Sequence, residues 1–304
     1  MFVHVSRLIP GNLRLAWLAV LALPVCLSSG CAVSHKTAVK PPATTQPTLT
    51  ASRQDLIARY NAIASGCASL NATANLQLTA GSSYSGVIEQ YHEVKSFILA
   101  SRPSSIRVIG QAPVVGKDIF DMVSDGQTFE IFIPSKNQFI TGPTDFDRKA
   151  SKPVENLRPQ HILDALFWSP ISSHAIVLLE QTNDPAPLYV LVVARLADPK
   201  DPDSWRLLEK ISFDRSDLFV SRIQTYSGDG LEISDVELSQ WQPEGALSYP
   251  RQVLLSRPSD DYHLRISITK LGLNETIAPD KFHLAQPGGS RLVRVGPDAE
   301  ESHP

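Results

Sequence analysis

The sequence contains few cysteines and no apolar run long enough to cross a membrane. Its three cysteines are Cys26, Cys31 and Cys67. The most apolar stretch, residues 13–23, ends at Pro24 and is shorter than the roughly 20 residues that a membrane-spanning helix requires. The sequence therefore does not predict a transmembrane anchor.

An excess of positive charge is also missing. The chain has 28 Lys and Arg against 31 Asp and Glu, a formal net charge of −3. Two of its basic residues, Arg7 and Arg14, lie in the N-terminal leader, so the remainder is more acidic still. Without a basic face the chain is not expected to bind nucleic acid, and only a lipid could hold it to a membrane.

Catalytic and metal-binding signatures are absent as well. Residues 110–118 resemble a phosphate-binding loop, but five residues rather than four separate its glycines, and Asp118 follows Lys117 where Ser or Thr is needed. We interpret this stretch as a turn between two strands. Residues 81–86 lack the Gly-x-Ser-x-Gly spacing of a nucleophile elbow, and the histidines show no metal-ligand spacing. We expect no enzyme, metal or cofactor.

The N-terminal residues do have the features of a lipoprotein signal peptide. Arg7 and Arg14 make the leader basic, residues 13–23 form a short apolar core, and small residues at 29–30 precede Cys31. Small residues give the signal peptidase access to the bond before the cysteine. We therefore predict cleavage before Cys31, acylation of Cys31, and attachment to a membrane through this lipid.

The residue after the acceptor, Ala32, is compatible with export to the outer membrane, so we expect the protein on the periplasmic face of that membrane. Because Cys26 leaves with the leader and Cys31 is acylated, Cys67 has no partner for an internal disulfide. We interpret Cys67 as a small buried apolar residue.

Composition divides the chain into four parts. Residues 1–30 are the signal peptide, and residues 31–51 are the acylated cysteine followed by a Pro- and Thr-rich tether that we expect to be disordered. Residues 52–285 carry the apolar periodicity of one folded domain. Residues 286–304 begin with Pro-Gly-Gly and end with acidic residues, so we expect a disordered tail.

Two helices are predicted in the domain. Ser52 and Asp55 form a capping box before apolar residues at helical spacing, namely Leu56, Tyr60, Ile63 and Cys67. Pro159 suits the first position of a second helix, whose apolar face would carry Ile162, Leu163, Leu166 and Phe167. Each helix needs an apolar surface to cover.

Most of the remaining domain alternates between apolar and polar residues, as strands do. Asp125-Gly126 and Asp229-Gly230 mark hairpin turns. About a dozen short strands with two helices do not suit a parallel α/β sheet. We predict a mainly β (α+β) fold in which one large, curved antiparallel sheet has one apolar face.

Two stretches carry a family resemblance. The first runs from Phe97-Ile98-Leu99 through Arg102-Pro103, Asp125-Gly126 and Ile131-Phe132-Ile133-Pro134 to Asn137-Gln138-Phe139, and the second from Ile268-Thr269-Lys270 through Leu273-Asn274-Glu275 to Phe282. In this order of strands, turns and closing residues the chain resembles the lipoprotein-localisation (Lol) carrier and receptor superfamily. The resemblance covers most of residues 52–284.

The resemblance implies a half-open β-barrel with two or more short helices over its mouth and an apolar cavity for acyl chains. Candidates for the cavity lining are Leu76, Leu78, Phe97, Leu99, Ile106, Val108, Phe120, Met122, Phe129, Ile131, Ile133, Ile162 and Leu166. For each of them, an ordinary sealed core is an equally good interpretation. Residues 196–204 look like an insertion, and the sequence does not identify the exposed apolar loop residue that the resemblance implies for a receptor.

Three functions follow from these observations. The first is a membrane-anchored carrier that binds lipids or acylated lipoproteins in outer-membrane lipoprotein sorting or envelope biogenesis, with a periplasmic carrier protein as a further expected partner. The second is a non-catalytic structural or assembly lipoprotein whose barrel is filled by side chains. The third is a periplasmic hydrolase, for which no catalytic set is apparent.

Overall fold

The computed structural model describes residues 47–81, 88–145, 156–198, 200, 201 and 203–296. The first helix, α2 (Arg53–Gly66), begins at the predicted capping box. The Asp55 amide donates to Ser52 Oγ at 3.2 Å, and the Ser52 amide donates to Asp55 Oδ2 at 3.0 Å. These bonds satisfy two of the backbone donors that a helix start leaves free. The acylation site predicted at Cys31 and most of the tether lie outside the described residues.

The rest of the fold is mostly strand. The second helix is α3 (Pro159–Leu166), and 3₁₀ turns occur at Pro134–Lys136, Pro258–Asp260 and Pro279–Phe282. The strands are β1 (Ser69–Ala80), β2 (Glu89–Gln90), β3 (Val94–Ser101), β4 (Ser105–Gln111), β5 (Asp118–Ser124), β6 (Thr128–Ile133), β7 (Gln138–Pro143), β8 (Ile176–Thr182), β9 (Leu188–Leu196), β10 (Trp205–Asp214), β11 (Val220–Tyr226), β12 (Glu232–Glu244), β13 (Leu247–Arg257), β14 (Tyr262–Leu273) and β15 (Arg291–Arg294).

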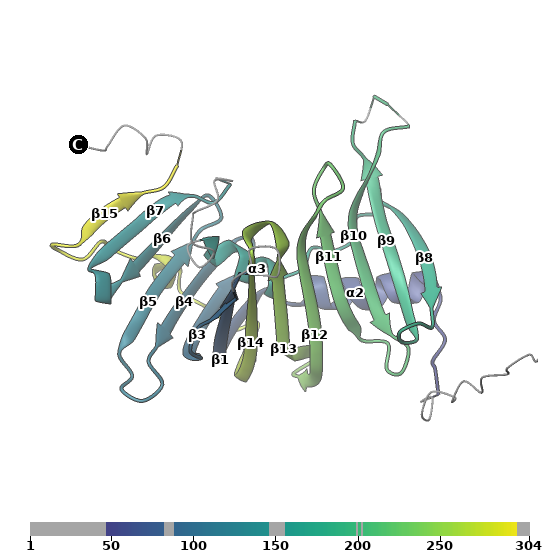
Figure 1. Ribbon diagram of the computed structural model, residues 1–304. Coiled ribbons are helices and arrows are strands. Elements are labelled where there is room, and N and C mark those ends of the chain that lie inside the picture. The colour runs from purple at the N-terminus through teal and green to yellow at the C-terminus, as the bar shows by residue number, and fades with distance from the viewer. Residues whose placement is uncertain (1–46, 82–87, 146–155, 199, 202, 297–304) are drawn as a thin grey trace, which may run out of the picture. The chain divides into compact units, whose positions relative to one another are not determined.

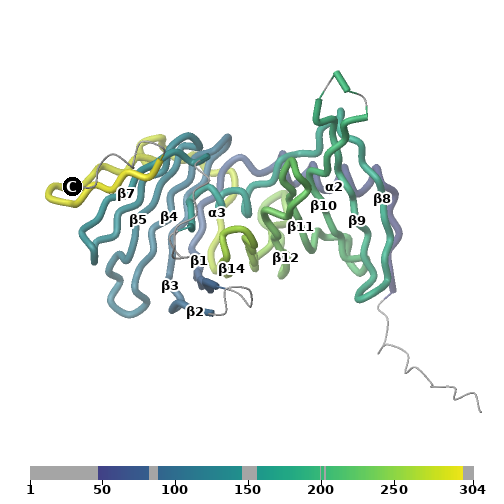
Figure 2. Tube along the Cα trace, turned by 45° about the horizontal axis from the view of Figure 1, so that its top comes forward, coloured from purple at the N-terminus to yellow at the C-terminus, as the bar shows by residue number. Residues whose placement is uncertain are grey.

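All of these strands belong to one sheet. Its order is β15-β7-β6-β5-β4-β3-β1-β14-β13-β12-β11-β10-β9-β8, with β2 paired to β1. The sheet curves without closing, and β15 and β8 are its two edges (Figures 1 and 2). The prediction of a mainly β, half-open barrel with covering helices is confirmed. It is corrected in one respect, because β15 pairs with β7 in parallel.

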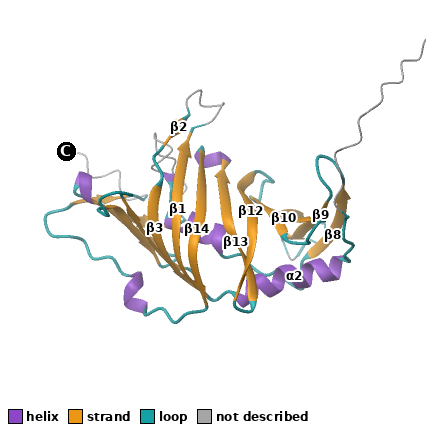
Figure 3. Ribbon diagram, turned by 90° about the horizontal axis from the view of Figure 1, so that it is seen from below, coloured by secondary structure: helices purple, strands orange, loops and turns teal. Residues whose placement is uncertain are grey.

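One face of the sheet, here called the inner face, carries the core. Alternate residues of β1 from Leu70 to Ala80 are buried on it, as strand geometry requires. The helix α2 runs beneath the β8–β12 half of the sheet (Figures 1 and 3). The shorter helix α3 contacts the neighbouring strands β4 and β5 and also β13, which is separated from β4 by β3, β1 and β14, and so bridges the two halves of the sheet. Both helices thereby cover the inner face.

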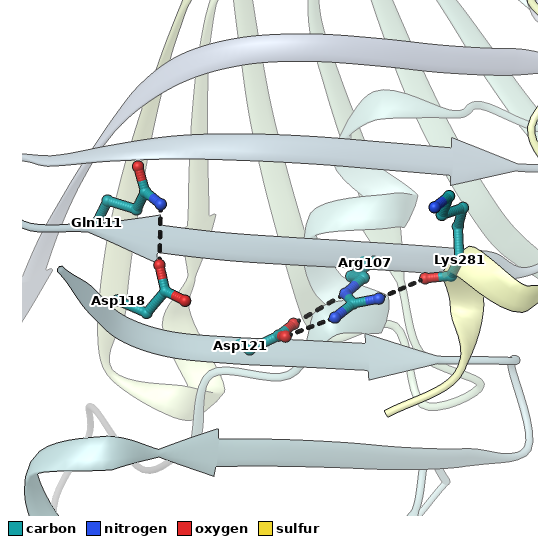
Figure 4. A network of polar contacts seen from close by, with 5 residues as sticks. All are labelled: Arg107, Gln111, Asp118, Asp121 and Lys281. Atoms are coloured by element: carbon teal, nitrogen blue, oxygen red, sulfur yellow. Dashed lines mark hydrogen bonds and ion pairs between the residues drawn. The ribbon is translucent and has the colours of Figure 1, made fainter. Parts of the chain in front are cut away.

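The opposite, outer face holds a smaller apolar cluster next to the C-terminal segment. Val123 and Phe139 pack there against Leu284. Arg107 on β4 makes a two-pronged ion pair with Asp121 on β5, at 3.0 and 2.7 Å, and donates to the Lys281 carbonyl at 3.0 Å (Figure 4). This network fixes the C-terminal segment to the sheet.

The C-terminal part of the chain departs from the prediction. Residues 286–296 are not a free tail, since β15 lies within them and pairs with β7 from Gln138 to Thr141. The four residues of β15 are too few for a periodicity to be recognised in the sequence. Residues 297–304 lie outside the described residues. The stretch 196–204, interpreted as an insertion, begins with the last residue of β9, and its other described residues lie between β9 and β10.

Candidate functional site

Most of the predicted lining residues lie together on the inner face. Cross-strand pairing places Leu76 opposite Ile266 and Val108 opposite Met122. The residues of the predicted lining that share this face are Leu76, Leu78, Ile106, Val108, Phe120, Met122, Phe129, Ile131 and Ile133 from the sheet, with Ile162 and Leu166 from α3. Whether they contact a ligand stays a prediction.

Two predicted lining residues, Phe97 and Leu99, lie on the outer face. Phe97 pairs with Thr73, whereas its neighbour Ile98 pairs with Ala72 and is fully buried on the inner face. Phe97 is 37% exposed, and Lys95 Nζ lies 5.4 Å from the centre of its ring. The run Phe-Ile-Leu is apolar on both faces of β3, so its composition does not reveal which residues point inward, and a shift of one residue reverses every side chain.

The inner-face residues differ in how tightly they are covered. Ile106, Val108, Phe129, Ile162 and Leu166 are buried. Phe120, Ile131 and Ile133 are only half-buried, on the strands nearest the β7 end of the sheet. The centre of the inner face is therefore a sealed core, and its apolar side chains are less completely covered at the β5–β6 end.

The helix α3 is seated at the centre of this face. Pro159 stands at its first turn, and no side chain caps its start. Ile162 and Leu166, four residues apart, point at the sheet. The hydroxyl of Tyr249 on β13 donates to the Leu166 carbonyl at 2.6 Å, which satisfies a backbone acceptor at the end of the helix.

Arg102, in the turn between β3 and β4, joins both helical segments to the sheet. Its Nη2 donates to the carbonyls of Ala64 at 2.6 Å and Trp168 at 2.7 Å, and its Nε donates to the Cys67 carbonyl at 2.8 Å. Its guanidinium also lies 5.2 Å from the Phe167 ring centre. One side chain thus holds the end of α2 and the residues after α3. Charge-assisted bonds of this kind are stronger than those between neutral groups.

Asn274, one of the residues that carry the family resemblance, has a structural role. It has a positive φ of 60°, a conformation that Asn adopts more readily than most residues. Its side chain accepts from the Ala68 amide at 2.7 Å and donates to the Gly66 carbonyl at 2.8 Å. Asn274 therefore fixes the chain between α2 and β1.

Cys67 is buried in the core, as predicted, and burial raises the pKa of its thiol to about 11. A thiol in this state is a poor nucleophile near neutral pH. Cys67 contributes packing at the point where α2 leads into β1.

The turn between β4 and β5 exposes two apolar side chains. Val114 is 95% exposed and Val115 is 74% exposed. The turn is closed by the Ala112 amide donating to the Lys117 carbonyl at 2.9 Å, and Gly116 adopts a φ of 63°. The interpretation of residues 110–118 as a turn is confirmed. Sequence reasoning missed the exposed valines, although the Ala-Pro-Val-Val-Gly run within this turn was a usable signal.

A polar pair joins α3 to β14. His161 Nδ1 is 2.6 Å from the Tyr262 hydroxyl. Burial, reinforced by Arg257 and Arg158, lowers the pKa of His161 well below its usual value, so the imidazole is neutral near pH 7. Burial also raises the pKa of Tyr262, so its hydroxyl stays protonated. His161 and Tyr262 are thus joined by a hydrogen bond between two uncharged groups, and neither group acts as a base that titrates near pH 7.

Within the described ranges, no group of three His, Cys, Asp or Glu side chains is placed to hold a metal ion. In the same part of the chain, no helix has both the length and the apolar character needed to span a membrane.

Comparison with known proteins gives likeness in structure only. No family model matches the chain, and no curated protein matches it in sequence. Similar solved structures include a LolA superfamily protein. That protein, from Nitrosomonas europaea, is 12% identical, with 77% of this chain and 99% of that chain covered and a TM-score of 0.44.

Two further structures are similar to the same extent. A DUF1329 family protein from Desulfovibrio piger is 12% identical, with 75% of this chain and 95% of that chain covered and a TM-score of 0.45. An outer membrane lipoprotein-sorting protein domain from Vibrio parahaemolyticus is 8% identical, with 75% and 94% covered and a TM-score of 0.43. These likenesses agree with the resemblance to the Lol superfamily. At such identities and scores they say nothing about what this chain binds.

Proposed function

We propose that this protein is a membrane-anchored periplasmic lipoprotein whose inner face binds the acyl chains of lipids or lipoproteins. The observation that carries the proposal is the way in which the apolar inner face is covered. The sheet does not close on itself, and two helices held by Arg102 and Tyr249 lie over its apolar side. To leave the sheet, such a cover must break a few hydrogen bonds and give up apolar packing that an acyl chain could replace, whereas a closed barrel would have to break a strand pairing.

The energetics of an acyl chain explain why a covered apolar face is useful. Burial of one methylene contributes roughly 0.8 kcal/mol, so a chain of about 15 methylenes is disfavoured in water by on the order of 12 kcal/mol. A carrier must enclose such a chain during transfer. It needs apolar side chains and a movable cover, and no catalytic residue.

The half-buried residues Phe120, Ile131 and Ile133 mark where an acyl chain would first enter. From there the chain would replace the contacts that Ile162 and Leu166 of α3 make with the sheet. This step requires α3 to move away from β4 and β5. The Arg102 bond to the Trp168 carbonyl is then the attachment that resists opening.

The exposed turn supplies a second link to a membrane. Val114 and Val115 project where a membrane surface could bury them, and Lys117 adjoins them at the base of the turn. Apolar side chains beside a basic residue favour the interface of an anionic bilayer. We propose that this turn contacts the outer membrane during cargo transfer.

The anchor and the partners complete the proposal. Cys31, acylated after signal-peptide cleavage, would hold the protein on the periplasmic face of the outer membrane. Its cargo would be lipids or acylated lipoproteins, delivered by a periplasmic carrier protein. Acylation is tested by labelling with palmitate, which Cys31→Ser should abolish. Absence of label in the unsubstituted protein would overturn the anchor.

A structural or assembly lipoprotein is the second candidate, and the sealed centre of the inner face favours it. Ile106, Ile162 and Leu166 have at most 1% of their surface exposed. If α3 never leaves this position, the barrel is simply filled and the protein serves as a rigid scaffold.

Native mass spectrometry separates the two candidates. The protein would be produced with Cys31→Ser, so that no acyl group is attached, and then incubated with a fatty acid and sprayed from volatile buffer. The carrier proposal predicts a saturable adduct of one or a few fatty acids, or a lipid retained from purification. A protein that carries no lipid and takes up none would overturn the carrier in favour of the scaffold.

A further inference from the structure

The edge strand β8 has three exposed apolar side chains. Among the described residues its only neighbouring strand is β9, and the two pair from Ile176 to Thr182 (Figure 1). Ile176 is 43% exposed, Leu178 is 60% exposed and Leu179 is 38% exposed. In the same part of the chain, no other strand has more than one large apolar residue with comparable exposure. The apolar surface is thus concentrated at this edge of the sheet.

These side chains are exposed on both faces of the sheet. Val177 pairs with Val193, which is buried in the core, so Val177 points to the inner face. Leu179 shares this face, whereas Ile176 and Leu178 point to the outer face, because side chains alternate along a strand. A membrane or a partner packed on one face would cover only one of the two sets. A further strand beside β8 would cover both, since its own side chains alternate in the same way.

The sequence of β8 does not protect this edge against another strand. Sheet edges are usually shielded by Lys, by Pro, by a bulge or by a short edge strand. The seven residues of β8 include no Lys or Pro, and their pairing with β9 is regular throughout. The opposite edge, β15, has only four residues, two of which are Arg291 and Arg294. Of the two edges, β8 is therefore the one suited to pairing.

A donor from outside the sheet already reaches the backbone of β8. Arg53, at the start of α2, donates from Nη1 to the Val177 carbonyl at 3.1 Å. An edge strand has a row of backbone groups that its single neighbour does not bind, and such groups form hydrogen bonds with an added strand. The backbone of β8 can thus be approached from the side away from β9.

We propose that β8 pairs with β8 of a second copy of this chain, in an antiparallel register centred on Leu178. The proposal is independent of lipid binding. In this register Leu178 lies opposite its own copy, and Val177 lies opposite Leu179, with which it shares the inner face. Ile176 lies opposite Glu180, so each carboxylate is separated from its copy. A register centred on Glu180 would place the two carboxylates opposite each other, which is destabilising.

The self-complementarity of β8 favours a second copy over an unrelated strand. A two-fold axis places the same surface of both copies in contact, so the strand must fit its own sequence. The register centred on Leu178 meets this requirement, because it covers the apolar half of β8 in both copies and keeps like charges apart. The two sheets would then form one continuous sheet, with their inner faces on the same side.

Sedimentation velocity of the Cys31→Ser protein over a range of concentrations tests the pairing, and we expect a monomer–dimer equilibrium. Leu178→Lys places two ammonium groups opposite each other and should raise the dimer dissociation constant roughly tenfold or more. Because Leu178 is exposed, the variant should fold normally, which its denaturant midpoint checks. The matched control is Leu231→Lys, at an exposed position between β11 and β12, which should leave the dissociation constant unchanged.

A mixture of two variants tests the register. Leu178→Glu alone should weaken the dimer as Leu178→Lys does, because two carboxylates then lie opposite each other. An equimolar mixture of the two variants should form a heterodimer, since the ammonium group of one copy then lies opposite the carboxylate of the other. Only a register that places residue 178 opposite its own copy gives this recovery.

Four outcomes would overturn the pairing. The first is a monomer at every concentration, and vesicle binding by that monomer that Leu178→Lys reduces would assign β8 to a membrane instead. The second is a dimer that Leu178→Lys leaves intact, and the third is a dimer that Leu231→Lys weakens to the same extent. The fourth is a mixture of Leu178→Lys and Leu178→Glu that associates no better than either variant alone. None of these outcomes bears on the fatty-acid binding expected of the inner face.

Discussion

The Arg102 guanidinium donates a hydrogen bond of 2.7 Å to the carbonyl of Trp168, 66 residues further along the chain. The same nitrogen donates to the Ala64 carbonyl at the end of α2. Both acceptors are backbone oxygens at helix ends, where the helix itself provides no donor. Arg102 therefore couples the two helices that cover the inner face to one turn of the sheet.

Replacement of Arg102 should destabilise the cover. Arg102→Met keeps much of the length of the side chain but removes all three donated bonds, and we expect a loss of about 2 to 4 kcal/mol in the free energy of unfolding. Arg102→Lys keeps the charge but not the planar guanidinium. Its free energy of unfolding should lie between those of the original protein and Arg102→Met. Denaturant titration measures the effect. An unchanged midpoint in Arg102→Met would mean that the helices are held by apolar packing alone.

Substitution of Leu166 tests how firmly α3 is seated. Leu166 is 1% exposed, so Leu166→Gln removes apolar packing and buries an amide, at an expected cost of about 3 kcal/mol or more. The matched control is Leu231→Gln at an exposed position, which should change stability by less than about 0.5 kcal/mol. The same titration measures both variants. Equal midpoints would contradict the burial of α3.

The turn that exposes Val114 and Val115 is expected to bind membranes. Replacing Val114 and Val115 by serine should leave stability within about 0.5 kcal/mol of the original, since both side chains are exposed. Binding to vesicles that contain anionic lipid should fall several-fold in a sedimentation assay with the Cys31→Ser protein. Ile88→Ser, at another exposed apolar position, is the control and should have no effect. Loss of binding in the control as well would show that the turn has no special role.

Glu209 on β10, whose side chain lies on the inner face opposite the buried Val193, predicts a pH dependence of stability. Its folded-state pKa is raised from 4.5 to about 7, so the folded state holds a proton that the unfolded state releases between these values. The free energy of unfolding therefore falls as pH rises from about 4.5 to 7, by at most about 3 kcal/mol at 1.4 kcal/mol per pKa unit. Glu209→Gln should remove this decline. Parallel pH profiles for the two proteins would contradict the burial of the carboxylate.

Local patterns predicted much of the fold, because helix starts and strand alternation depend on neighbouring residues. The capping box at Ser52 and the proline at the start of α3 were visible in this way. Alternation failed at Phe97-Ile98-Leu99, where both faces are apolar and the pairing with β1 decides which residues point inward. The parallel pairing of β15 was not predictable, since β7 lies about 150 residues earlier in the chain.

The candidate site was predictable in its apolar part and not in its polar part. The inner-face residues from Leu76 to Ile133 follow from periodicity. The three acceptors of Arg102 are backbone atoms brought together by folding, and no sequence pattern records them.

Titration of a fluorescent fatty acid into the Cys31→Ser protein and its Leu166→Gln variant shows whether acyl chains bind on the inner face under α3. We expect saturable binding by the Cys31→Ser protein and weaker binding by Leu166→Gln, both measured without denaturant, where both proteins are folded. Saturable fluorescence that unlabelled fatty acid displaces would support it. The absence of saturable binding by the Cys31→Ser protein would contradict this binding site and leave a filled structural barrel.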